Sequence, residues 1–391
     1  METHVNFEDL PDFDSVAGML IPEELADSIS VDRVVDGKFW YFSEPCVAAY
    51  VSMLEASSAH TTYKDSMDCL TDNLTEIVEK ILAEIPKQGG GPPRLDLVAL
   101  GIGTARKECV ILGRLLEEFK NTATRVSLVA VDFSYPLLMH GIRRVKTTFA
   151  YEKERFDLRL YVADYTKREA GDFGGTGDTF TLITAPGLLH NSPIPDIFYS
   201  LQKLMTKNTL LLIDAEMIGG RTDEELCSQY TDEPSKRFFF TPLSLLARAS
   251  EEEHKRMDDQ TGGGHKYKEF KSVGYVPERI TAAVVCGNNL DEFRQSHGLP
   301  PGTLNGMKLS PGPGSKTVMI TYKQDGSFYV LGHTARFLEI EFAAMLDRYG
   351  FEVVYECGHK RKHTRYYLLK MKTGDSPGAG SEDDDKSDAS I

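Results

Sequence analysis

Two glycines separated by one residue stand where a mostly apolar segment gives way to a helical pattern. Leu95–Leu100 has the character of a buried strand, and Gly101-Ile-Gly103-Thr104 follows it directly. Glycine lets the backbone adopt a positive φ and approach a ligand closely. The segment therefore predicts a cofactor-binding turn that includes Thr104, and a tight turn without a ligand is the alternative.

Acidic residues follow the next two predicted strands. Asp132 ends the segment Val129-Ala-Val-Asp132, where its carboxylate can accept hydrogen bonds from both hydroxyls of an adenosine ribose, and Phe133 comes next. Asp164 and Tyr165 follow the third strand. Asp164 can accept a hydrogen bond from the adenine amine while Tyr165 packs near the ring, and a capping role is the alternative for Asp164.

The order of these residues favours S-adenosylmethionine over a dinucleotide as the cofactor. A nucleotide dehydrogenase usually has a third glycine before its helix, whereas Ala105 and Arg106 stand there in this chain. We also find no catalytic Tyr–Lys pair of the short-chain oxidoreductase type. A nicotinamide-dependent oxidoreductase is therefore the least favoured interpretation.

The segments that must position these residues alternate between strands and helices. Strands are expected at 95–100, 125–131, 157–162, 179–183 and 209–214, and helices at 106–119, 135–145 and 194–205. This alternation predicts an α/β fold with a doubly wound parallel sheet that binds ligands at the carboxyl ends of its strands. A helix at 335–349 and strands at 352–357 and 366–371 would close the sheet with an antiparallel hairpin.

The same patterns divide the chain into five segments. We expect an N-terminal segment at 1–87 with helices at 44–56 and 67–85, a Rossmann-like core at 88–218, an inserted α+β substrate lobe at 219–334, a return to the core at 335–372 and a disordered acidic tail at 373–391. Within the lobe, a helix at 242–257 and strands near 280–285 and 317–322 are expected. The glycine-rich loop at 262–265 is interpreted as a lid.

Charge and composition limit the classes of partner. The formal net charge of -15 would repel a phosphate backbone, and the one basic cluster, 360–365, leads into a predicted strand. The apolar stretches are far shorter than the roughly 20 residues of a membrane-spanning helix. Six cysteines without a close pair fit a reducing compartment. We expect a cytoplasmic protein with a small-molecule substrate and without a nucleic-acid, membrane or metal partner, whereas its oligomeric state stays open.

The motifs described above resemble the histidine-specific methyltransferases of ergothioneine biosynthesis and their fungal relatives that act on tryptophan-derived amino acids. The resemblance covers roughly Arg94–Asp214 and rests on the segments 100–104, 129–134, 163–165 and 185–191. It implies a class I (Rossmann-like) methyltransferase fold and S-adenosyl-L-methionine as the methyl donor. It also implies an N-methyltransferase of secondary metabolism that acts on a small amino-acid-like or aromatic amine.

The resemblance further implies three substrate-binding residues. Asn191 would hold the amino-acid backbone of the acceptor, Tyr230 would bind its carboxylate, and Tyr41 would form part of the acceptor pocket. Each residue has a structural alternative. Asn191 could cap the helix that follows it, Tyr230 could be an ordinary half-buried tyrosine, and Tyr41 could belong to an aromatic core.

Two departures from the family pattern bear on the acceptor. Val318 stands where the histidine enzymes carry a glutamate that recognises imidazole, which favours a bulkier and less polar amine than histidine. His190 replaces a glycine, and it is either a general base or a structural histidine. The sequence alone identifies no catalytic residue. A hydroxyl or carboxyl acceptor and a non-catalytic adenosylmethionine-binding partner protein remain alternatives.

Overall fold

The computed structural model describes most of the chain between Arg33 and Lys372. The described residues are 2–3, 25, 29, 33–86, 94–152, 154–174, 179–190, 194–258, 274–287, 289–299, 304, 307, 309, 315–324, 327–358 and 363–372. Three features expected from the sequence lie outside them, namely Asn191, the glycine-rich loop at 262–265 and the acidic tail at 373–391.

The larger sheet has the strand order β1-β4-β3-β2-β5-β6-β11-β10. Its strands are β1 (Glu2–Thr3), β2 (Arg94–Leu100), β3 (Arg125–Asp132), β4 (Phe156–Val162), β5 (Thr179–Thr184), β6 (Thr209–Glu216), β10 (Phe351–Gly358) and β11 (Thr364–Met371). The five strands from β4 to β6 pair in parallel, and β11 and β10 follow as an antiparallel hairpin. This order confirms the expected Rossmann-like fold, a doubly wound sheet closed by an antiparallel hairpin.

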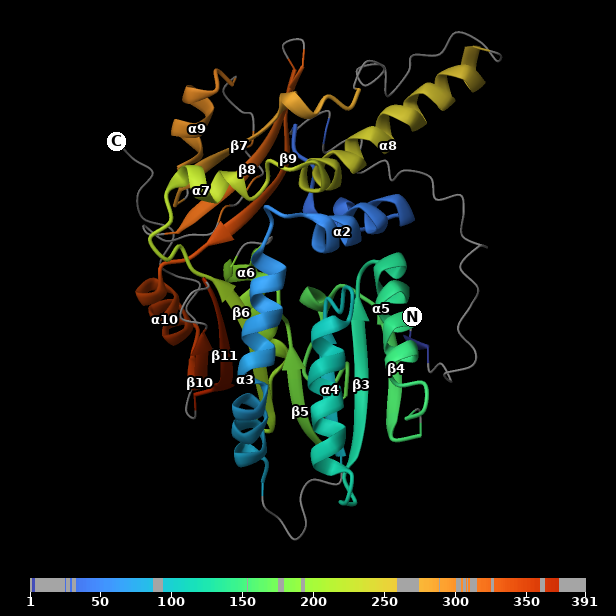
Figure 1. The fold of residues 1–391 in the computed structure, drawn as a ribbon, viewed down its shortest axis with the longest axis vertical. Coiled ribbons are helices and arrows are strands. Elements are labelled where there is room, and N and C mark those ends of the chain that lie inside the picture. The colour runs from blue at the N-terminus through green and yellow to red at the C-terminus, as the bar shows by residue number, and fades with distance from the viewer. Residues whose placement is uncertain are drawn as a thin grey trace, which may run out of the picture.

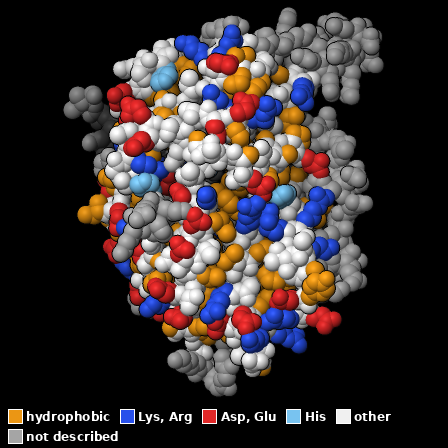
Figure 2. All heavy atoms as spheres, viewed as in Figure 1, with side chains coloured by type: hydrophobic (Ala, Val, Ile, Leu, Met, Phe, Trp, Pro, Cys, Tyr) orange, Lys and Arg blue, Asp and Glu red, His pale blue; other side chains and the backbone are white. Residues whose placement is uncertain are grey.

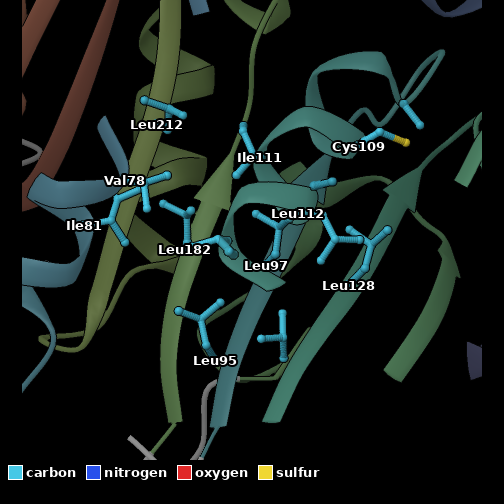
Figure 3. Close-up of a cluster of buried hydrophobic side chains, with 14 of the residues drawn as sticks. Val78, Ile81, Leu95, Leu97, Cys109, Ile111, Leu112, Leu128, Leu182 and Leu212 are labelled. Atoms are coloured by element: carbon cyan, nitrogen blue, oxygen red, sulfur yellow. The ribbon is translucent and has the colours of Figure 1, made fainter. Parts of the chain in front are cut away.

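Helices cover both faces of this sheet (Figure 1). One face packs against α3 (Thr62–Glu84), α4 (Arg106–Phe119) and α5 (Tyr135–Thr148), and the opposite face against α6 (Ile194–Leu204) and α10 (Glu339–Arg348). Figure 3 shows leucines of the central strands meeting side chains of α3 and α4. Because both faces are buried, the central strands carry nearly continuous apolar runs.

A smaller antiparallel sheet lies beyond the carboxyl ends of the parallel strands (Figure 1). It consists of β7 (Ile280–Cys286), β8 (Lys316–Gln324) and β9 (Ser327–Arg336). One aromatic-rich cluster joins it to η3 (Gly37–Trp40), α2 (Glu44–Ala56), α7 (Asp223–Ser228) and α8 (Glu233–Asp258). Its opposite face packs against α9 (Leu290–Ser296). The described residues between β6 and α10 thus form an α+β layer above the main sheet.

Two expected boundaries in this layer are wrong. The helix expected from Ala335 begins at Glu339, because Ala335 and Arg336 end β9. The helix expected from Pro242 begins at Glu233, because this proline lies inside α8 rather than in its first turn. Proline is usual at a helix start, so its position in the sequence indicated the wrong boundary.

Among the described residues, no helix combines the length and apolarity required to cross a membrane. Acidic and basic side chains are interspersed over the face of the molecule that Figure 2 shows.

Candidate active site

A cavity of about 760 Å³ opens at the carboxyl ends of the parallel strands. Its walls include most of the predicted cofactor residues and part of the N-terminal segment: Gly101, Gly103, Asp132, Phe133, Asp164, Tyr165, Trp40 and Tyr41. Small-molecule sites commonly measure about 300–1,000 Å³. The fold therefore brings the glycine turn and both acidic strand ends to one cavity, which we call the outer cavity.

The glycine turn has three residues in the left-handed region of backbone space. Gly101, Gly103 and Ala105 have φ values of 63°, 54° and 56°. Gly101 donates its backbone N–H to Val131 at 2.8 Å, which ties the turn to the end of β3. Ala105 stands where a nucleotide dehydrogenase usually has its third glycine. It takes a left-handed conformation although it has a Cβ. The turn thus keeps a glycine-like geometry through to the start of α4.

The turn also depends on a glycine in α5. A Cβ at Gly141 would lie 2.6 Å from the Gly103 carbonyl oxygen and 3.3 Å from the Ala105 Cβ. We expect Gly141→Ala to lower the free energy of unfolding by about 1–3 kcal/mol through overpacking. Gly113→Ala in α4 is the matched control, because its Cβ would meet only the Phe149 ring, at 3.8 Å.

The control should gain up to about 1 kcal/mol, since alanine is the better residue in a helix interior. Urea denaturation followed by circular dichroism measures both variants. A similar change in the two variants would contradict the close approach of α5 to the turn.

Asp132 is held between the turn and the start of α5. Its Oδ2 accepts a hydrogen bond from the Gly103 backbone N–H at 3.3 Å and its Oδ1 from the Ser134 N–H at 2.9 Å. Burial raises the pKa of Asp132 to about 7, although these amides act in the opposite direction. Ser134 also caps α5 and donates a hydrogen bond to the backbone carbonyl of Tyr41. The carboxylate is therefore fixed in position, with lone pairs left for a ligand.

Asp164 caps a short helix, which was the structural alternative considered from the sequence, and it also lies in the wall of the outer cavity. Its side chain caps the short helix η4 (Tyr165–Lys167) by accepting hydrogen bonds from the Thr166 backbone N–H at 3.1 Å and hydroxyl at 2.6 Å. Burial raises the pKa of Asp164, but the Thr166 hydrogen bonds and Lys167 together hold this pKa below its usual value. Burial raises the pKa of Tyr165, so the phenol stays neutral.

A second, smaller cavity of about 80 Å³ adjoins the first. The two share Trp40, Tyr41, Tyr50 and Gly187 as walls. We call this second space the inner pocket. Much of its surface is aromatic, from Trp40, Tyr41, Tyr50, Tyr63, Tyr230, Phe238 and Phe239. Gly332 in β9 is required for this packing, since a Cβ there would lie 2.5 Å from the Phe239 ring and 2.7 Å from Trp40.

The polar side of the inner pocket contains a buried ion pair between Lys107 and Asp214. The Lys107 Nζ lies 2.8 Å from the Asp214 Oδ2, and both side chains are almost fully buried. Asp214 also accepts hydrogen bonds from the Ser66 hydroxyl and, at 2.5 Å, from the Gly187 backbone N–H. Burial raises the pKa of Asp214, but Lys107 and the other neighbouring groups, among them the Ser66 hydroxyl, together hold this pKa below its usual value. Asp214 therefore stays ionised and fully engaged.

A second buried network centres on Glu216 and Arg336. The Glu216 carboxylate lies 2.9 Å from the Arg336 Nε and accepts a hydrogen bond from Arg221 at 2.6 Å. Arg336 also donates to the Tyr230 hydroxyl at 2.5 Å. Burial raises the pKa of Glu216, but Arg336, Arg221 and the other neighbouring groups together hold this pKa well below its usual value. The Tyr230 hydroxyl also has a hydrogen bond with the Thr334 side chain, so it is engaged within this network.

Two histidines complete the lining of the inner pocket. The Nδ1 atoms of His60 and His190 are buried and have no hydrogen-bond partner among the described residues. Burial lowers the pKa of both imidazoles, and that of His60 falls to about 4. Both rings are therefore neutral at pH 7. Leaving a buried polar atom unpaired costs about 1–3 kcal/mol, so each is unusual in a native structure.

The remaining predicted residues are placed as follows. Thr104 is buried with its hydroxyl 3.1 Å from that of Tyr63, and it is not among the residues that line either cavity. Tyr41 lines both cavities and Tyr230 lines the inner pocket. Val318 is fully buried in the aromatic-rich cluster and lines neither cavity, so it does not face an acceptor in either space.

The sequence did not single out Lys107, Asp214, His60 or Arg336, which also line the inner pocket. Asp214 carried a signal, because it ends a strand that was expected at 209–214. A carboxylate at the end of a parallel strand belongs to the ligand-binding edge of such a sheet.

No protein-family model and no curated protein matches the sequence. Among solved structures, the chain is similar to the CcbJ methyltransferase from Streptomyces caelestis, with 10% identity, 77% of this chain and 90% of that chain covered, and a TM-score of 0.35. It is also similar to magnesium protoporphyrin IX methyltransferase from Synechocystis PCC 6803 with bound SAH, with 11% identity, 89% and 100% coverage, and a TM-score of 0.39. At such low identities and TM-scores, these likenesses concern the fold alone.

Proposed function

We propose that the chain is an S-adenosylmethionine-dependent methyltransferase that acts on a small amino-acid-like or aromatic amine. The observation that carries this proposal is the pairing of two adjoining cavities. The outer cavity combines the glycine turn with Asp132 and Asp164, and the inner pocket is lined by aromatic rings and polar groups. A donor and an acceptor in these two spaces would meet where Tyr41, Tyr50 and Gly187 form a common wall.

The residues of the outer cavity suit adenosylmethionine. Asp132 would accept hydrogen bonds from the ribose hydroxyls, and Asp164 from the adenine amine. Phe133 and Tyr165 offer aromatic surface beside the adenine, and Gly101 and Gly103 allow the backbone to come close to the bound molecule. When bound, adenosylmethionine supplies a methyl group on a sulfonium that an uncharged nucleophile can attack. The chain itself orients the two reactants and excludes water.

The inner pocket supports an aromatic or weakly polar acceptor. Its volume of about 80 Å³ is smaller than the cavity of about 150 Å³ that holds a benzene molecule. Only the reacting end of an acceptor would therefore fit, while the rest extends into the outer cavity. Tyr41 and Tyr230 are the substrate residues that this arrangement favours, and Asn191 remains a candidate from the sequence.

A hydroxyl acceptor is the second candidate, and the neutral His190 is the observation that favours it. A hydroxyl group loses its proton only as the new bond forms, so it benefits from a nearby neutral base. Mass spectrometry after incubation with adenosylmethionine would distinguish the two by testing tryptophan, histidine, aromatic amines and phenols for a gain of methyl groups. We expect aromatic amines to exceed free histidine, and comparable turnover of histidine would exclude the proposed acceptor class.

The affinity for S-adenosylhomocysteine should weaken as the pH falls below about 7. Burial raises the pKa of Asp132 to about 7, and protonation places a hydrogen on an oxygen that would otherwise accept from a ribose hydroxyl. Because the bound state favours the carboxylate, each pH unit below this pKa should weaken binding by up to about tenfold. Isothermal titration calorimetry across this range measures the effect. In Asp132→Asn the remaining affinity should no longer depend on pH in this range. An equal change of affinity with pH in the variant and the wild-type protein would assign the pH dependence to another group.

A further inference from the structure

The unpaired imidazoles of the inner pocket are not explained by packing alone. His190 ends η5 (Leu188–His190), three residues after Gly187, which lines both cavities. Only 7% of His190 is exposed, and its Nδ1 has no hydrogen-bond partner among the described residues. His60 lies before α3 with its ring 5.4 Å from that of Tyr230, and its Nδ1 also has no such partner. Two unpaired nitrogens in one small pocket indicate that a bound molecule supplies their partners.

Several other polar groups of the pocket already have hydrogen-bond partners. Asp214 accepts from Lys107, Ser66 and the Gly187 backbone. The Tyr63 hydroxyl lies 3.1 Å from that of Thr104, and burial raises the pKa of Tyr63 to about 12. The Tyr230 hydroxyl already accepts from Arg336. The two histidines, in contrast, each keep an unpaired ring nitrogen that can accept a proton.

We propose that His190 is the general base of the methyl transfer, and that the acceptor group it deprotonates binds in the inner pocket with His60 as a second hydrogen-bond partner. The proposal rests on the proposed function and narrows its acceptor class. His190 is preferred over His60 because it belongs to the loop of Gly187, at the wall where the two cavities meet.

The charges around His190 determine which proton it can accept. Burial lowers its pKa, Asp214 and Glu216 in β6 raise it, and Arg336 in β9 and Lys107 in α4 lower it. An alkylammonium has no lone pair and must lose its proton before it attacks, and this transfer to a histidine is roughly 10⁴-fold unfavourable even for ordinary pKa values of about 6.5 and 10.4. A neutral aromatic amine or phenol attacks with a lone pair that it already has, and it releases its proton only as the new bond forms. The acceptor should therefore be neutral at pH 7 and carry an N–H or O–H on an aromatic ring.

The proton transfer balances with the methyl transfer. The acceptor nitrogen or oxygen forms a bond to the methyl carbon as the carbon–sulfur bond breaks, and the electron pair of that bond stays on sulfur. The acceptor proton moves to the imidazole of His190 and then leaves to solvent with the product.

Aniline, phenol and benzylamine form a set of probes of similar size that tests this assignment. With the full-length protein and adenosylmethionine, aniline or phenol should gain a methyl group, whereas benzylamine, an alkylammonium at pH 7, should not. His190→Gln should lower kcat by about 10²–10⁴-fold and leave the affinity for S-adenosylhomocysteine unchanged. His60→Gln should raise KM more than it lowers kcat. His140→Gln in α5, which lines neither cavity, is the matched control and should leave kcat unchanged.

Nitrogen-15 NMR of the imidazoles keeps the test decisive if turnover is slow. With S-adenosylhomocysteine bound, aniline or phenol should shift the His190 signal, and that imidazole should stay neutral at pH 7. Methylation of benzylamine alone, a His190→Gln variant with wild-type kcat, or the absence of any shift with both aromatic probes would each overturn the assignment. Failure of the wild-type protein to bind S-adenosylhomocysteine would instead overturn the proposed function.

Discussion

Replacing Lys107 with methionine is expected to lower the free energy of unfolding by about 3–5 kcal/mol. The Lys107 ammonium lies 2.8 Å from the Asp214 carboxylate, and the exposed fractions of the two side chains are 7% and 1%. Methionine has a similar length and would fill the space, so the loss comes from a buried carboxylate left without its cation. Desolvation of such an unpaired charge is expensive.

Urea denaturation at pH 7 measures this loss. The double variant Lys107→Met/Asp214→Leu is the informative control, because it removes the second charge as well. We expect it to be more stable than Lys107→Met alone, since the uncompensated carboxylate is gone. A loss below about 1 kcal/mol in the single variant would mean that the pair behaves as a surface salt bridge.

Replacing Asp132 with alanine is expected to weaken the binding of S-adenosylhomocysteine by at least about 100-fold. Two hydrogen bonds from ribose hydroxyls to a carboxylate contribute about 1.5–3 kcal/mol each. The same substitution leaves the backbone N–H groups of Gly103 and Ser134 without their acceptor, so the geometry of the turn is also lost. Circular dichroism should confirm that the variant is folded before its affinity is interpreted.

Asp164→Ala is the matched comparison at the end of the next strand. Its side chain is 43% exposed and its hydrogen bonds serve the cap of η4, so its interaction with an adenine amine is weaker. We expect a decrease in affinity of about tenfold or less. Equal effects of the two substitutions would contradict the assignment of the ribose to Asp132.

The parts of the fold that the sequence predicted correctly are those whose signals are local. The central strands are nearly continuous apolar runs, and the turn at Gly101 and Gly103 directly follows the strand that positions it. Asp132 and Asp164 could be placed because each directly follows a predicted strand, and parallel strands end at a common edge. The outer cavity was therefore predictable from pattern and spacing.

The inner pocket was not predictable in the same way. Lys107, Asp214 and Arg336 come from three separate elements and His60 from the loop before α3, and only the three-dimensional packing brings them together. The ion pairs of Lys107 and Arg336 also depend on how deeply these side chains are buried, which cannot be inferred from a short stretch of sequence. The strand β9 was not among the predicted strands, and Gly332 within it leaves room for the rings of Trp40 and Phe239.

Calorimetric titration of the full-length protein with S-adenosylhomocysteine tests the central proposal most directly. We expect saturable binding at one site per chain, strong loss of that binding in Asp132→Ala, and no binding of NADH. A folded wild-type protein that binds no S-adenosylhomocysteine, or that binds NADH in its place, would contradict the methyltransferase assignment.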